Sequence, residues 1–250
     1  MVFPTGVRGQ TGRPPMCLLM LLLVAAGCQG PLAQAQPVEL PADCGAPVDY
    51  VALGDSTVVG VGASSPANSY VSRLSVRLRT AYPRGVTTNL GVSGATSADV
   101  VREQLPKVGS LHPSLVTLSV GPNDITQGKD VTQYRDNMRK LLDALLGDIS
   151  AVTVVNLLPD LALAPRFTPD ERSRLETRTQ QVNDVLRGEQ GRRGLELVDL
   201  YTASQRERPG HPELFSADGY HPSDAGYARW AELMWSGVAR RVAPACLRGG

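Results

Sequence analysis

Short apolar runs alternate with segments of helical spacing along most of this chain, and this alternation limits the possible folds more than any other feature. Such runs are typical of buried strands, and the predicted strands cover residues 50–53, 86–90, 115–120, 152–158 and 195–200. Apolar residues spaced three or four apart predict helices over 70–81, 97–105, 131–146, 169–187 and 223–242. Ser97 is the expected cap of the second helix and Gly147 the expected end of the third. The order predicts a parallel sheet covered by helices on both faces, with ligands bound at the carboxyl ends of the strands.

The length and charge of the chain suit one domain of this kind. It has 250 residues, of which 42% are hydrophobic, and that length leaves little room for two α/β domains. The 25 Lys and Arg residues balance 24 Asp and Glu residues without any block of like charge. We therefore expect no nucleic-acid partner. Aromatic residues make up 5% of the chain, which argues against a carbohydrate-binding module built on exposed aromatic side chains.

The first 27 residues have the features of an export signal. Arg8 and Arg13 make a weakly basic start, and an apolar run over 17–26 follows. That run is too short to span a bilayer, which needs about 20 residues, and it fits the apolar region of a signal peptide. Small residues then lead to Cys28, as in bacterial lipoprotein signals. We therefore predict an exported protein that is lipidated at Cys28, with residues 1–27 removed.

An ordinary secretory signal is the alternative, with cleavage near Ala33 or Ala35. The protein would then be secreted without lipid. With lipid on Cys28, residues 28–46, which are rich in Pro, Gln and Ala, predict a flexible tether. The folded domain is expected over 47–250, and contact with a membrane only through the N-terminal lipid.

Two of the four cysteines remain for the folded domain. Cys17 lies in the signal and Cys28 would carry lipid, which leaves Cys44 and Cys246 near the two ends of the domain. In an exported protein such a pair favours a disulfide. Two unpaired thiols are the alternative.

Three of the predicted strands end in segments that could carry chemistry. Ser56 follows the first strand and could present a nucleophilic hydroxyl, but a serine there also suits a helix cap. Gly94 follows the second strand, and Asn123 the third; both could donate to a developing oxyanion, or simply form turns. The stretch around Ser93 nearly matches the Gly-x-Ser-x-Gly elbow of α/β-hydrolases. It ends in Ala95 and comes too early in the chain, so we reject it.

His221 is the histidine best suited to act as a base. Asp218 lies three residues before it, just ahead of the last predicted helix, where a carboxylate could hold the imidazole in one tautomer. The other two histidines, His112 and His211, lie in polar loops beside prolines and are expected to be solvated. A helix-entry turn is the simpler interpretation of Asp218 and His221 taken alone. No histidine or cysteine spacing matches a zinc site, so no metal is expected.

Four blocks together resemble the signature blocks of the SGNH/GDSL hydrolases, in the same order. They are Gly54-Asp55-Ser56, Gly94, Gly121-Pro122-Asn123-Asp124 and Asp218-x-x-His221, and the similarity spans residue 50 to the final helix. Pro122 departs from the family, since many members have glycine there. The resemblance implies a flavodoxin-like three-layer α/β/α sandwich on a five-stranded parallel sheet. It also implies an esterase or lipase that needs no cofactor.

The roles of the site residues follow from the same resemblance. Ser56 would attack the ester, His221 would be its base, and Asp218 would orient the imidazole. The backbone N–H groups of Ser56 and Gly94 and the side-chain amide of Asn123 would form the oxyanion hole.

The substrate stays open at this stage between small-molecule, glycan and lipid esters. Polysaccharide O-acetyl esterase, lysophospholipase and thioesterase activities all fit the same site, and a non-catalytic glycan-binding lipoprotein is the alternative from another class. The segment 159–169, which is rich in Pro, Ala and Leu, is expected to border the pocket and help set acyl size. We expect a monomer.

Overall fold

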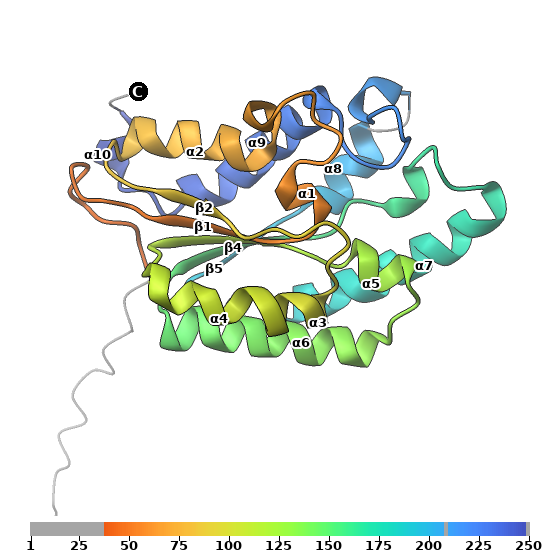
Figure 1. Ribbon diagram of the computed structural model, residues 1–250, viewed down its shortest axis with the longest axis horizontal. Coiled ribbons are helices and arrows are strands. Elements are labelled where there is room, and N and C mark those ends of the chain that lie inside the picture. The colour runs from red at the N-terminus through yellow and green to blue at the C-terminus, as the bar shows by residue number, and fades with distance from the viewer. Residues whose placement is uncertain (1–37, 208–209, 249–250) are drawn as a thin grey trace, which may run out of the picture. The chain divides into compact units, whose positions relative to one another are not determined.

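A five-stranded sheet with helices on both faces forms the centre of the computed structural model, which describes residues 38–207 and 210–248 (Figure 1). The strands are β1 (Tyr50–Gly54), β2 (Thr87–Asn89), β3 (Leu115–Ser119), β4 (Val152–Asn156) and β5 (Leu195–Val198). Neighbours pair in parallel in the order β2-β1-β3-β4-β5. This is the order of flavodoxin-like sheets, and it confirms the predicted fold class.

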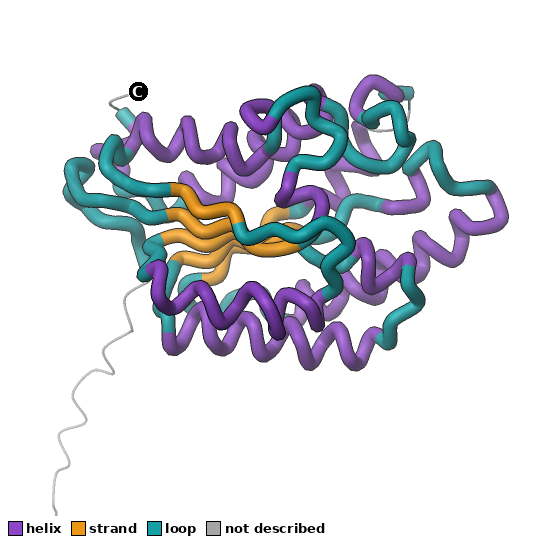
Figure 2. Tube along the Cα trace, in the orientation of Figure 1, coloured by secondary structure: helices purple, strands orange, loops and turns teal. Residues whose placement is uncertain are grey.

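The helices form a layer on each side of the sheet, which is the middle layer in Figure 2. On one side Figure 1 shows α2 (Tyr70–Ala81), α9 (Asp224–Ala239) and α10 (Pro244–Leu247). On the other side lie α3 (Ser97–Asp99), α4 (Leu105–Val108), α6 (Val131–Asp143) and α7 (Pro169–Gly188). The remaining helices are α1 (Ser56–Val59), α5 (Pro122–Thr126) and α8 (Leu200–Glu207).

Each face of the sheet has its own hydrophobic core, because successive strand residues point to opposite faces. In β1, Tyr50 and Ala52 pack with Leu74 of α2 and Met234 of α9. The intervening residues of the same strand pack on the other side, in a core that includes Met138 and Leu141 of α6. β1, β3 and β4 are buried on both faces, so these strands read in sequence as nearly continuous apolar runs.

Two predicted helix boundaries are wrong. Thr96, not Ser97, caps α3: its hydroxyl and backbone N–H bond to Asp99, which completes a capping box. Ser97 instead donates its hydroxyl to a carboxylate in another segment, described below. Gly147 does not end the third predicted helix, because a π-helical turn, Ala144–Asp148, continues α6 past it. At Ser97 a tertiary hydrogen bond uses the hydroxyl that could have capped the helix. At Gly147 the helix continues through the glycine.

The C-terminal third also differs from the prediction. The strand predicted over 195–200 ends at Val198, and Leu200 begins the unpredicted helix α8. The last predicted helix ends at Ala239, and the separate short helix α10 follows it.

Cys44 and Cys246 form a disulfide, with their Cα atoms 5.3 Å apart. This confirms the predicted pairing. The bond joins the start of the domain to α10 across a separation of 202 residues. Closing so long a loop stabilises the native state by up to about 5 kcal/mol in the chain-entropy model.

Candidate active site

Gly54 ends β1 in a conformation that only glycine tolerates. Its φ is +142°, and a Cβ atom there would lie 1.8 Å from the carbonyl oxygen of Ser119 in β3. The backbone N–H of the next residue, Asp55, donates to that same oxygen at 3.2 Å. The missing side chain therefore lets β1 and β3 stay close at their carboxyl ends, immediately before the predicted nucleophile.

The peptide group of Gly54 is also clamped by a buried side chain, Gln104. The Gly54 N–H donates to Gln104 Oε1 and Gln104 Nε2 donates to the Gly54 oxygen, both at 2.8 Å. Gln104 is the last residue of a π-helical segment, Val100–Gln104, and such segments are frequent near functional sites. The amide clamp fixes the backbone two residues before Ser56.

Asp55 caps α1 from a fully buried position. Its Oδ1 atom accepts hydrogen bonds from the backbone N–H and the hydroxyl of Thr57, both at 2.9 Å. Its Oδ2 atom is buried and has no hydrogen-bond partner among the described residues. Burial raises the pKa of Asp55 to about 6, although the bonds from Thr57 and the charge of His221 lower it. The carboxylate form is therefore costly to keep in this position.

A prediction about stability follows for Asp55→Asn. Because the native pKa is raised to about 6 from an unfolded value of about 4, ionisation of the carboxyl group lowers the stability of the fold as pH rises from about 4 to about 6. The loss amounts to about 3 kcal/mol at neutral pH. Asparagine keeps the oxygen that caps α1 but does not titrate. We expect the stability of the variant relative to wild type to improve by about this amount between about pH 4 and pH 7 in urea unfolding.

Asp218→Asn is the matched control with the opposite sign. The native pKa of Asp218 is lowered, so its contribution to stability is present at neutral pH and is lost on acidification. The relative stability of this variant should fall, not rise, as pH increases. A flat difference for Asp55→Asn would contradict the cost assigned to its burial.

Ser56, His221 and Asp218 lie in one continuous hydrogen-bonded chain. His221 Nε2 is 2.9 Å from Ser56 Oγ, and His221 Nδ1 is 2.6 Å from Asp218 Oδ2. Ser56 is 7% exposed, whereas the side chain of Asp218 is 42% exposed. The structure therefore brings together a hydroxyl, an imidazole and a carboxylate from segments 165 residues apart in sequence.

Several donors hold Asp218 in its ionised form. Its Oδ1 atom accepts from the hydroxyl of Ser216 and from the backbone N–H groups of Tyr220 and His221, at 2.8 to 2.9 Å. Partial burial raises the pKa of Asp218, but the bonds from His221, Tyr220 and Ser216 outweigh it and hold the pKa below its usual range. An acceptor of this kind fixes the imidazole with Nδ1 protonated and leaves Nε2 free to accept a proton.

Gly94 and Asn123 lie in adjoining segments, because Asn123 of α5 bonds to Ala95, the residue after Gly94. Figure 1 shows α1 and α5 at the same end of the sheet. Asn123 Nδ2 donates to the oxygen of Ala95 at 3.0 Å, and the N–H of Val92 donates to the oxygen of Gly54 at 3.1 Å. These two bonds tie the loop that contains Gly94 to both neighbouring strand ends. Gly94 has a φ of +82° and open space on its Cβ side.

A buried network behind Asn123 was not predicted as part of the site. Asp124 accepts from the backbone N–H and the hydroxyl of Ser97, at 2.9 and 2.6 Å, and Asn137 donates to that hydroxyl. Burial raises the pKa of Asp124, and the bonds from Ser97 oppose it. The network holds α5 and α3 together and so positions Asn123. In sequence, Ser97, Gln104 and Asn137 are polar residues at helix positions that are otherwise apolar. This departure from the apolar pattern was the signal that could have identified them.

A small, mostly apolar pocket opens beside Ser56 and His221. Three of its lining residues, Pro159, Leu161 and Ala164, come from the predicted segment 159–169, which confirms that this segment borders the pocket. The lining is completed by Thr57, Pro122, Tyr220, Pro222 and Trp230. The other two histidines lie elsewhere: His112 is exposed, and His211 bonds to Glu213 on the surface. No group of residues suited to hold a metal occurs in the described part of the chain.

Comparison with known proteins gives a consistent set of similarities. Residues 52–229 match the model of the GDSL-like Lipase/Acylhydrolase family. A GDSL-like esterase of Mycobacterium tuberculosis is 29% identical over 211 residues, which are 79% of this chain and 62% of that protein. The chain therefore spans less than two thirds of the length of this relative.

Two solved structures illustrate the likeness of fold. A member of the lipolytic G-D-S-L family from Veillonella parvula superposes with a TM-score of 0.63 at 19% identity, over 78% of this chain and 100% of the other. A two-domain esterase active on acetylated mannans superposes with a TM-score of 0.60 at 18% identity, over 81% of this chain and 51% of the other. At these identities the likeness concerns the fold alone.

Proposed function

Because the chain belongs to the GDSL-like Lipase/Acylhydrolase family, we propose that it hydrolyses carboxylic esters through an acyl-enzyme on Ser56. The observation that carries this proposal is the hydrogen-bonded chain from Ser56 through His221 to Asp218. A hydroxyl is a weak nucleophile at neutral pH, and an adjacent base oriented by a third group activates it.

The proposed reaction has two halves. Ser56 Oγ attacks the ester carbonyl carbon while His221 Nε2 takes the hydroxyl proton, and Asp218 stabilises the imidazolium that forms. The imidazolium then gives its proton to the alkoxide oxygen, the alcohol leaves, and the acyl group remains on Ser56. In the second half a water molecule gives a proton to His221 and attacks the acyl-enzyme, which releases the carboxylic acid and restores Ser56.

The oxyanion of each tetrahedral intermediate needs hydrogen-bond donors. We assign this role to the backbone N–H groups of Ser56 and Gly94 and to the side-chain amide of Asn123. The bond from Asn123 Nδ2 to Ala95 supports the assignment, because it uses one amide hydrogen and fixes the direction of the second. Donors held in place before the reaction cost no reorganisation when charge develops.

Asn123→Ala should lower kcat by about 10²- to 10³-fold, as expected for the loss of one oxyanion donor. KM should change little, because the donor acts on charge that is present only in the transition state. Steady-state kinetics with p-nitrophenyl acetate measures both parameters. A raised KM with an unchanged kcat would instead place Asn123 in ground-state binding.

Labelling with a fluorophosphonate probe tests the proposed activity directly. A catalytic serine should react, and peptide mapping should place the label on Ser56. A scaffold that only binds glycan has no activated hydroxyl and would stay unlabelled. An unlabelled, folded protein without turnover of any p-nitrophenyl ester would contradict the proposal.

Short-chain acyl esters, including acetyl esters of polysaccharides, are our preferred substrates. The small apolar pocket beside Ser56 supports a short acyl group, and one structural neighbour acts on acetylated mannans. Lysophospholipids and thioesters remain the competing substrate classes. Turnover of acetylated mannan, lysophosphatidylcholine and acyl-CoA, measured side by side, would rank the three.

We also propose export of the protein, with a lipid anchor on Cys28. Residues 1–37 lie outside the described part of the chain, so the proposal rests on the signal-like sequence before Cys28. The Cys44–Cys246 disulfide supports an oxidising compartment. No helix in residues 38–207 and 210–248 is long and apolar enough to cross a membrane. Detergent partitioning of wild type against Cys28→Ser, with size-exclusion chromatography for the expected monomer, tests these points.

A further inference from the structure

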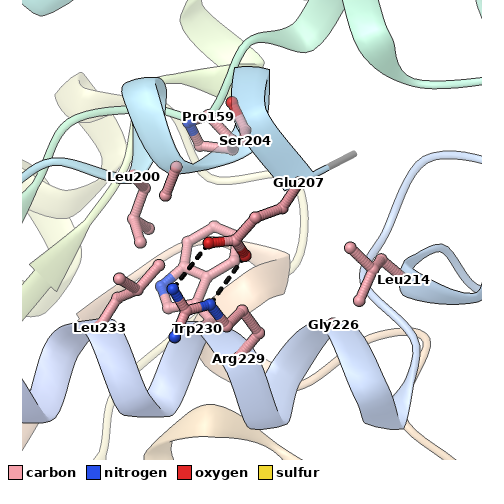
Figure 3. Close-up of a pocket in the computed structure, with 10 residues that line it drawn as sticks. Pro159, Leu200, Ser204, Glu207, Leu214, Gly226, Arg229, Trp230 and Leu233 are labelled. Atoms are coloured by element: carbon pink, nitrogen blue, oxygen red, sulfur yellow. Dashed lines mark hydrogen bonds and ion pairs between the residues drawn. The ribbon is translucent and has the colours of Figure 1, made fainter. Parts of the chain in front are cut away.

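A second, largely apolar chamber lies between α8 and α9 (Figure 3). It adjoins the pocket at Ser56, because two residues line both. Its walls include Leu200 and Ala203 of α8, Leu233 of α9 and Leu214 of the loop between these helices. None of the groups assigned to ester hydrolysis lines this chamber. It is therefore a separate feature of the fold.

Pro159 and Trp230 line both cavities. The indole of Trp230 and the ring of Pro159 therefore stand between the chamber and the pocket that holds Ser56. Pro159 lies in the segment that follows β4, and its ring has little conformational freedom. Trp230 is the larger of the two and projects from the first half of α9, so its side chain sets how far the pocket extends.

Aromatic packing holds Trp230 in this position. The residue is 5% exposed, and its ring stacks on Tyr70 with centroids 5.8 Å apart and an interplanar angle of 19°. Its Nε1 atom is buried and has no hydrogen-bond partner among the described residues. Replacement of the indole by an aliphatic side chain would consequently leave no partner group unpaired.

An ion pair forms part of the chamber lining. Arg229 donates to both carboxylate oxygens of Glu207 at 2.6 and 2.7 Å, which links α9 to α8. Figure 3 shows this pair together with Trp230, Leu200 and Leu233 among the residues that line the chamber. Apart from this ion pair, Ser204 and Gly226, the residues that line the chamber have apolar side chains that suit an acyl chain.

We propose that Trp230 determines the acyl length that this protein accepts, by closing the pocket at Ser56 against the chamber between α8 and α9. The inference rests on the proposed ester hydrolysis and adds the substrate class: esters of short acyl groups, of acetyl to butyryl size. Longer acyl chains are excluded by the indole, and the chamber behind it would fit them once the indole is made smaller.

Trp230→Leu tests the inference with p-nitrophenyl acetate, butyrate and octanoate. Wild type should prefer the two short esters. In the variant the octanoate-to-acetate ratio of kcat/KM should rise by about tenfold or more, because each methylene admitted to an apolar site favours the longer chain. Trp230→Phe should give a smaller rise in the same direction, and it preserves the aromatic contact with Tyr70 if the leucine variant does not fold.

Ala203→Phe is the matched control, since Ala203 lines only the chamber. Alone it should leave the turnover of all three esters unchanged. Combined with Trp230→Leu it should refill the chamber and return the ratio to the wild-type value. This reversal separates an opened cavity from a general loosening of the site.

Three results would overturn the inference. One is a wild-type protein whose kcat/KM for the octanoate ester equals that for the acetate ester. Another is a folded Trp230→Leu variant whose octanoate-to-acetate ratio of kcat/KM is unchanged. The third is a Trp230→Leu variant that changes the preference among acetate esters of different alcohols and not the preference for acyl length. That result would show that the pocket beside Ser56 binds the alcohol part of the ester. Failure of wild type to hydrolyse any ester would count against the proposed function itself.

Discussion

Ser56→Ala is expected to lower the turnover of p-nitrophenyl acetate by about 10⁴-fold or more while the protein stays folded. His221 Nε2 lies 2.9 Å from Ser56 Oγ, so the substitution removes the hydroxyl group that this base activates. The loss of one buried oxygen should change the free energy of unfolding little. Ser56 is the first residue of α1, but the side chain that caps this helix is that of Asp55. Circular dichroism and thermal unfolding check the fold, and single-turnover kinetics check the rate.

Ser93→Ala provides the matched control for that experiment. Ser93 lies in the neighbouring loop, within the stretch that nearly matches the elbow motif, and it is exposed. We expect its loss to leave kcat and KM near the wild-type values. Undiminished turnover by Ser56→Ala, or a loss by Ser93→Ala as large as that of Ser56→Ala, would contradict the assignment of the nucleophile.

Gly54→Ala is expected to destabilise the protein by more than about 4 kcal/mol, or to prevent folding. The new Cβ atom would lie 1.8 Å from the Ser119 oxygen and 2.8 Å from Val58 Cγ2. Relief of that clash requires β1 to move away from β3, which breaks the parallel pairing at the end of the sheet where Ser56 lies. The expected fall in Tm is roughly 10 °C, measurable by differential scanning calorimetry.

Gly191→Ala separates the clash from backbone strain alone. Gly191 also has a positive φ, of +89°, but a Cβ atom there would meet no other atom within 4 Å. Its cost should be only that of a left-handed residue, about 1–2 kcal/mol. Equal losses of stability in Gly54→Ala and Gly191→Ala would show that the close approach to Ser119 adds no cost beyond backbone strain.

Most elements of the fold were predictable because their signal is local. The helices α2 and α7 begin at the predicted residues, because burial of one helix face spaces apolar residues about 3.6 apart. Each strand overlaps its predicted range, and the strands buried on both faces are marked by short apolar runs. The predicted cap at Ser97 was wrong because a distant residue binds its side chain. Ser97 has the chemistry of a helix cap, but its hydroxyl bonds to Asp124, 27 residues away.

The functional site was predictable only in part. The blocks around Ser56, Asn123 and His221 could be found because each lies at a strand end or a helix entry and has a family-like spacing. Gln104 and Trp230 were missed. In sequence they are one amide and one aromatic residue within helical patterns, and their roles depend on partners in other segments.

By itself the sequence determined the class of fold, the family, and the residues that could supply a nucleophile, a base and a carboxylate. These are encoded in short motifs and in the periodicity of apolar residues, which need no knowledge of distant contacts. Only the tertiary structure decided the strand order, the 2.9 and 2.6 Å contacts that join Ser56, His221 and Asp218, the burial of Asp55, and the two cavities that share Pro159 and Trp230 as lining residues. Each of these depends on segments far apart in the chain, and their proximity is set by the packing of both cores against the sheet.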